Sequence, residues 1–95
     1  MLDMYVAQNE ELAYRIIDDE AVILTPEDGM LHNLNPVATR IFELANGKRT
    51  VKDIIKRVLE EFQADEKAVT RDVPDFIDDL LHKKMLILSS KPLKV

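Results

Sequence analysis

The sequence contains no cysteine, no tryptophan and only two glycines among its 95 residues. Without cysteine the chain has no disulfide, thiolate ligand or thiol nucleophile, so packing alone must stabilise the fold. Two glycines cannot build a glycine-rich phosphate-binding loop. No apolar stretch approaches the roughly 20 residues that span a bilayer, and the first residues lack the pattern of a signal peptide. These absences predict a cytoplasmic protein with no membrane partner.

Positive charge is also scarce, because 13 lysines and arginines stand against 18 aspartates and glutamates, a net charge of -5. Nucleic-acid-binding domains normally carry a basic excess, so we expect no nucleic acid partner. His32 and His82 lie far apart, and neither has a second histidine or a glutamate at metal-ligand spacing. We therefore expect no metal, no other cofactor and no enzymatic activity of the isolated chain.

Enough apolar residues remain to form a folded core, with 46% hydrophobic and 33% charged residues. We expect a single domain over residues 1–95 whose core covers about residues 12–88. Apolar residues alternate before about residue 34 and recur every three or four residues after it, which predicts strands followed by helices. The strands are expected at residues 12–17, 21–24 and 30–34 as an antiparallel meander, with a turn at residues 26–29 that contains Pro26 and Gly29.

Helix starts are marked by capping residues. Asn35 followed by Pro36 predicts a first helix to about residue 45, which Gly47 would end in a left-handed conformation. Thr50 and Asp53 form the pattern of a capping box and predict a second helix over residues 51–62. The buried stripe of the first helix is expected to consist of Val37, Ile41 and Leu44, with Ala38 and Phe42 beside it.

A third helical stripe runs through residues 66–82 but contains Pro74, which removes one backbone hydrogen bond. Either one kinked helix covers the whole range, or Asp72 caps a second start with Pro74 in its first turn. We favour the single helix because Val69 and Val73 keep phase with Phe76. The apolar run over residues 85–88 predicts a further strand or an extended tail.

A small three-stranded antiparallel sheet followed by three helices predicts an α+β fold that is winged helix-turn-helix-like, which allows a DNA-binding regulator as an alternative. Phosphates would be repelled by the third helix, however, which carries Asp72, Asp75, Asp78 and Asp79. Several basic residues cluster around the start of the second helix. They form either a solvated face of that helix or a patch that binds an acidic partner. These basic residues are Lys48, Arg49, Lys52, Lys56 and Arg57.

Three segments of the sequence resemble the PqqD-like family. Residues 34–44 (LNPVATRIFEL) are similar to its pattern of Leu-Asn, a small apolar pair, Ile and an aromatic residue before Leu. Residues 47–54 (GKRTVKDI) resemble its Gly-x-x-Thr-Val-x-x-Ile segment, and Asp72-Val73 with Phe76 and Leu80 resemble its Asp-Val-x-x-Phe-Leu-x-x-Leu helix. The resemblance covers about residues 12–88, and the spacing between the segments is more specific than any one of them.

The resemblance implies a non-enzymatic domain that binds the leader segment of a ribosomally made precursor peptide and presents it to a radical S-adenosylmethionine enzyme or another modifying enzyme. By similarity, the leader would pair as an added strand with residues 30–34 and lay side chains into a groove beside the third helix. We expect Leu34 in the core. The implied peptide contacts are Leu31, His32, Asn33, Val69, Arg71, Asp72, Val73, Asp75 and Phe76. A small scaffold or oligomerisation module without a peptide ligand remains the third hypothesis.

Overall fold

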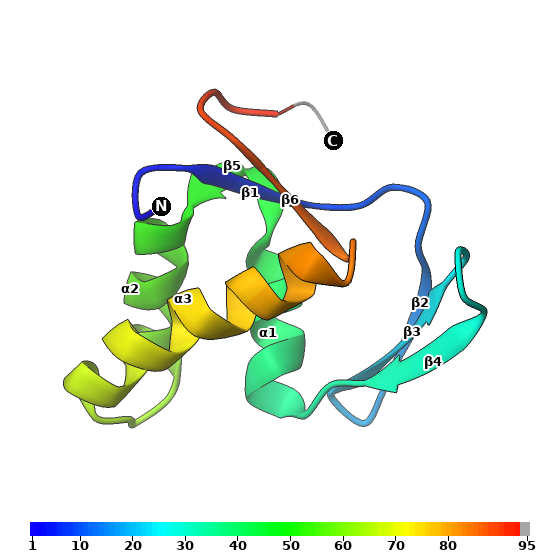
Figure 1. Ribbon diagram of the computed structural model, residues 1–95. Coiled ribbons are helices and arrows are strands. Elements are labelled where there is room, and N and C mark those ends of the chain that lie inside the picture. Colours follow the sequence, from blue (N-terminus) through cyan, green and yellow to red (C-terminus); the bar gives the residue numbers. More distant parts are fainter. Residues whose placement is uncertain (94–95) are drawn as a thin grey trace.

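Within residues 1–93, which the computed structural model of the chain describes, three helices and two three-stranded antiparallel sheets make up the fold (Figure 1). The helices are α1 (Pro36–Leu44), α2 (Val51–Glu61) and α3 (Glu66–His82). The strands are β1 (Tyr5–Gln8), β2 (Ala13–Ile17), β3 (Glu20–Thr25), β4 (Met30–Asn33), β5 (Asn46–Thr50) and β6 (Leu86–Ser89). The predicted α+β class, with a strand meander followed by helices, is confirmed.

The predicted meander is the sheet β2-β3-β4, with β3 in the centre and β2 and β4 as its two edges. Asp18 and Asp19 form the first turn with positive φ values of 51° and 64°, a conformation that matches the twist of a two-residue hairpin. Gly29 ends the second turn with a φ of 67°, as the Pro-Glu-Asp-Gly pattern predicts. Both turns therefore leave β4 at the margin of the sheet.

The second sheet, with the order β5-β1-β6, was not predicted from the sequence. Its central strand β1 pairs Tyr5 with Thr50 of β5 on one side and with Ser89 of β6 on the other. The run after residue 85 is thus a strand. Gly47 does have a positive φ of 84°, but it lies inside β5, and α1 already ends at Leu44 with Ala45 as its C-cap.

Local capping explains where α1 and α2 begin. The side chain of Asn35 accepts a hydrogen bond of 2.8 Å from the Ala38 N–H, and Pro36 occupies the first turn. Thr50 and Asp53 form the expected capping box, each side chain accepting from the other residue's backbone N–H. These caps fix the entry of both helices.

Helix α3 is a single helix over Glu66–His82 with Pro74 inside it, so the alternative of a second start at Asp72 is wrong. Asp65 caps its N-terminus by accepting from the Ala68 N–H. Among the described residues 1–93, no helix has the length and apolar character that crossing a bilayer requires.

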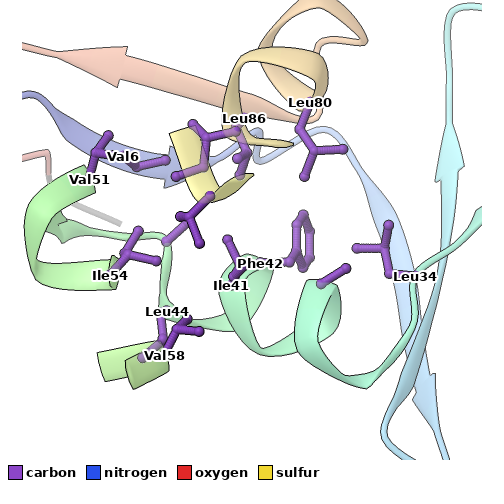
Figure 2. Packing of buried hydrophobic residues seen from close by; sticks show 14 of the residues in the cluster. Val6, Leu34, Ile41, Phe42, Leu44, Val51, Ile54, Val58, Leu80 and Leu86 are labelled. Carbon is purple, nitrogen blue, oxygen red and sulfur yellow. The ribbon is translucent and has the colours of Figure 1, made fainter. Parts of the chain in front are cut away.

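The core lies between the three helices and both sheets, and Phe42 of α1, which is 0% exposed, stands among side chains of α1, α3 and β6 (Figure 2). The Tyr14 ring of β2 meets it edge-on, with centroids 5.0 Å apart. Leu34 is buried, as predicted. The expected burial of Val37 is wrong, because this side chain is 40% exposed at the N-terminal end of α1.

Candidate peptide-binding site

The outer edge of β4 exposes backbone groups that can pair with another strand. The Leu34 N–H donates to the Ala21 carbonyl at 2.9 Å, toward β3. Because backbone groups of successive residues in an antiparallel strand point to opposite sides, His32 also faces β3. Leu31 and Asn33 then direct their N–H and C=O groups away from the sheet. This strand edge is a template for strand addition.

The side chains of β4 divide between the two faces of its sheet. Leu31 is 66% exposed and pairs with Leu24, whose side chain also points away from the helices, and Asn33 lies on the same face. His32 is half-buried on the face toward α1, with its Nε2 atom 3.4 Å from the hydroxyl of the buried Thr25. The backbone of Leu31 and Asn33 thus faces the free edge, while His32 contributes a side chain to the helical side.

A buried hydroxyl holds the end of β4 against α1. Thr39 Oγ1 donates to the Leu34 carbonyl at 3.1 Å and accepts from the Ala21 N–H at 2.8 Å. Thr39 is only 2% exposed, so these bonds are shielded from water and rigid. They fix the direction in which β4 meets the first turn of α1.

Beside this junction, an apolar pocket of about 340 Å³ lies between α1, α2 and α3. Val69 and Val73 of α3 are almost fully buried there, at 8% and 4% exposed, while Phe76 is half-buried. The pocket is lined by Asn35, Val37, Ala38, Ile41, Val58, Phe62, Ala64, Ala68, Val69, Asp72, Val73 and Phe76. Only Asn35 and Asp72 bring polar side chains to it, so the pocket suits an apolar group.

Helical periodicity explains why α3 contributes four of the predicted residues to the pocket. Val69, Asp72, Val73 and Phe76 are separated by three or four positions and therefore share one face of the helix. Because β4 ends at Asn33 and Asn35 lines the pocket, the free strand edge runs toward the pocket.

The structure does not place two of the predicted residues in the pocket. Arg71 and Asp75 are exposed on α3 and do not line it. Arg71 Nε instead donates to Asp72 Oδ1 at 2.9 Å, and this hydrogen bond lowers the pKa of the Asp72 carboxyl. Asp72 is therefore ionised at neutral pH, at the rim of an otherwise apolar pocket.

Sequence reasoning missed the walls that α1 and α2 supply, namely Val37, Ala38 and Ile41 on one side and Val58 and Phe62 on the other. Val37 was assigned to the core because it follows the apolar stripe of α1. In an amphipathic helix, a stripe residue at the first turn can face the core or a neighbouring groove, and periodicity does not separate the two. Across residues 1–93, no group of three or more His, Cys, Asp or Glu side chains is arranged to hold a metal ion.

A free strand edge that leads to an apolar pocket between helices is the geometry of a domain that binds an extended peptide by strand addition. Residues 20–86 match the family described as coenzyme PQQ synthesis protein D (PqqD). The match covers more than half of the chain, and the chain belongs to this family. The predicted resemblance is confirmed.

Similar proteins include one named for binding PqqA and two solved in complex with a leader peptide. A "PqqA binding protein" of Gluconobacter oxydans (strain 621H) is 28% identical over 80 residues, which cover 84% of this chain and 81% of that protein. The structure "TbiB1 in Complex with the TbiA(beta) Leader Peptide" is 29% identical, has a TM-score of 0.75, and the match covers 84% of this chain and 93% of the other. "Lasso peptide synthetase B1 complexed with the leader peptide" shares the fold at 18% identity and a TM-score of 0.74, with coverage of 86% and 96%.

Proposed function

We propose that this chain binds the leader segment of a ribosomally made precursor peptide and presents it to a separate modifying enzyme. The observation that carries the proposal is the free edge of β4, whose end at Asn33 meets the apolar pocket between the helices. Membership of the PqqD family and likeness to a PqqA binding protein and to leader-peptide complexes support it.

The direction of β4 determines which part of the leader would enter the pocket. Strand β4 runs toward α1, so an antiparallel leader strand would begin near Asn33 and run back past Leu31. Residues of the leader that precede its paired segment would then lie at the pocket. We infer that an apolar side chain at this position binds against Val69, Val73 and Phe76, with His32 beside the paired segment and Arg71, Asp72 and Asp75 at the rim.

In this proposal the chain supplies binding and position, and the chemistry belongs to the partner. A radical S-adenosylmethionine enzyme acting in pyrroloquinoline quinone formation is the first candidate, because one relative is named a PqqA binding protein. The likeness to TbiB1, which was solved in complex with the TbiA(beta) leader peptide, makes another peptide pathway the second candidate. We place the encounter in the cytoplasm, where a ribosomally made precursor first appears.

The proposed binding mode predicts where a leader perturbs the protein. When the ¹⁵N-labelled chain is titrated with a synthetic leader of the precursor encoded beside its gene, we expect amide shifts at Leu31 and Asn33 and along Val69–Phe76. The Leu31 and Asn33 amides should also become protected from hydrogen exchange, because each N–H gains a partner. Shifts confined to β2 or β5, or no saturable shift, would contradict the proposal.

Filling the pocket is expected to weaken leader binding without unfolding the protein. Ala68 lines the pocket and is half-buried on α3, and leucine is nearly as good a helix former as alanine. Ala68→Leu should therefore raise the leader Kd about tenfold, while the melting temperature changes little. The matched control is Thr70→Leu, at an exposed position of the same helix outside the pocket. Equal leader affinities of both variants, measured by calorimetry, would remove the pocket from the site.

A further inference from the structure

Two oppositely charged side chains connect α1 to α2 beside the apolar pocket. Arg40 of α1 donates two hydrogen bonds to the Glu61 carboxylate of α2, from Nε to Oε1 at 2.7 Å and from Nη2 to Oε2 at 3.0 Å. Arg57, one turn before Glu61, donates to the same carboxylate at 3.0 Å. Arg40 also lies 3.9 Å from the Glu43 carboxylate. We call Arg40 and Glu61 the interhelical clamp.

The interhelical clamp lies at the ends of the two helices that no backbone segment joins. The end of α1 and the start of α2 are connected through β5, which keeps those two ends close. The pocket is lined instead by the first two turns of α1 and by the last turn of α2 with its C-cap. Arg40 directly precedes the pocket residue Ile41, and Glu61 directly precedes the pocket residue Phe62. The clamp therefore ties together the two helix ends between which the pocket opens.

The clamp constrains the position of the helices more than it stabilises the fold. The side chains of Arg40 and Glu61 are 32% and 29% exposed, and ion pairs that water reaches contribute little to the free energy of unfolding. A bidentate pair of guanidinium and carboxylate nevertheless fixes both the distance and the orientation of its two groups. The hydrogen bonds from Arg40 lower the pKa of Glu61 to about 2, so this carboxylate is ionised at neutral pH.

The spacing of α1 and α2 decides the width of the pocket, whose volume is about 340 Å³. Within residues 1–93, the clamp supplies the only hydrogen bonds and the only ion pair between these two helices, which otherwise meet through apolar side chains. A site whose walls are already in place binds its ligand without the entropic cost of ordering them. Loss of the clamp would therefore leave the walls to be ordered by the ligand itself.

We propose that the interhelical clamp sets the width of the pocket and thereby determines which apolar side chain of the leader the pocket accepts. This inference rests on the proposed leader binding. Arg40 and Glu61 do not line the pocket, so they act through Ile41 and Phe62 as positioning residues. A pocket of fixed width favours the side chain that fills it, whereas a loosened pocket distinguishes less between large and small side chains.

The test measures how strongly the protein distinguishes two ligands. One is the synthetic leader, and the other is the same leader with alanine at the apolar residue whose truncation weakens wild-type binding most. We expect wild type to bind the alanine leader about tenfold or more weakly, and Glu61→Gln to bind it about threefold or less weakly than the unchanged leader. Glu61→Gln should also raise the Kd of the unchanged leader about fivefold. Its melting temperature should fall by no more than about 5 °C.

Two further variants make this result specific to the clamp. Glu60→Gln removes the same charge from the neighbouring exposed position of α2, where the described part of the chain shows no ion pair, and it should bind both leaders as wild type does. Arg40→Gln should lose as much discrimination as Glu61→Gln. The double variant should lose no more than either single variant, because each change alone already breaks the interaction.

Three results would overturn the inference. The first is a preference between the two leaders that stays at the wild-type ratio in Glu61→Gln, because a merely structural ion pair would weaken both leaders by the same factor. The second is the same loss of preference in Glu60→Gln, which would assign the effect to surface charge. The third is additive losses for Arg40→Gln and Glu61→Gln. A wild-type chain that binds neither leader would instead remove the proposed function, and the inference with it.

Discussion

Replacing Asn33 with proline is expected to raise the leader Kd about tenfold or more and to leave the protein folded. The Asn33 N–H points to the free edge of β4, so proline removes a donor that the leader needs and none that β3 uses. Loss of one backbone hydrogen bond costs about 1 kcal/mol, and the ring also blocks close approach of the added strand. Calorimetric titration with the leader measures the effect, and circular dichroism confirms the fold.

Two matched variants make this result specific. Asn33→Ala keeps the backbone donor and should bind the leader nearly as well as the wild type. Ile16→Pro places the same ring on β2, whose outer edge is the other margin of the sheet, and should leave the leader Kd nearly unchanged. If Ile16→Pro weakens binding and Asn33→Pro does not, the leader pairs with β2 instead.

Truncating Phe76 to alanine is expected to lower both stability and leader affinity. Replacing a fully buried phenylalanine with alanine lowers the free energy of unfolding by about 3 to 5 kcal/mol. Phe76 is only half-buried, because one side of its ring packs against the core and the other lines the pocket. We therefore expect a loss of about 2 to 3 kcal/mol, a large share of the roughly 5 to 15 kcal/mol available to a small domain. Denaturant melts measure this loss, and titration at a temperature where the variant is folded measures the lower affinity. A variant with wild-type stability and wild-type leader affinity would remove α3 from both the core and the site.

Asp72 supplies the control for Phe76, because it lines the same pocket but is exposed. Asp72→Asn should keep the free energy of unfolding, since its only side-chain hydrogen bond in the described chain is to its neighbour Arg71. Its leader affinity should change only for a leader with a basic or polar group at the rim, and then by electrostatics. A large loss of stability in this variant would show that the carboxylate has a structural role.

The helices and the meander could be predicted because their signals are local. Asn35 and Thr50 cap helices through hydrogen bonds to residues three positions on, so the sequence carries both partners of each bond. Gly29 with Pro26 specifies its turn in the same way. In contrast, β1 is only four residues long and its pairing partners lie about 40 and 80 positions away. No local pattern specifies such pairs, and β5, with its Gly, Lys and Arg, has low strand propensity.

Part of the candidate site could likewise be predicted from local patterns in the sequence, and part could not. Helical periodicity places Val69, Val73 and Phe76 on one face of α3. Strand alternation places the side chains of Leu31 and His32 on opposite faces of the sheet. Which elements surround that helix face depends on how α1 and α2 pack, so the contributions of Val37 and Phe62 could not be predicted. The hydrogen bond between Arg71 and Asp72 depends on the rotamers of both side chains, and a sequence does not specify rotamers.

The central position of β1 in its sheet has a consequence for the order of folding. Hairpins β2-β3 and β3-β4 close over short turns, and such contacts form within microseconds. Strand β1 precedes both hairpins in the chain, but it pairs only with β5 and β6, which come later. The chain segment between β1 and β6 is longer than the one between β1 and β5, so pairing with β6 carries the greater entropic cost of loop closure. Because only residues 83–85 separate α3 from β6 and the two elements are in contact, the strand that completes this sheet also holds the C-terminal end of the helix that lines the pocket. During synthesis on the ribosome, the β4 edge would therefore form before the pocket.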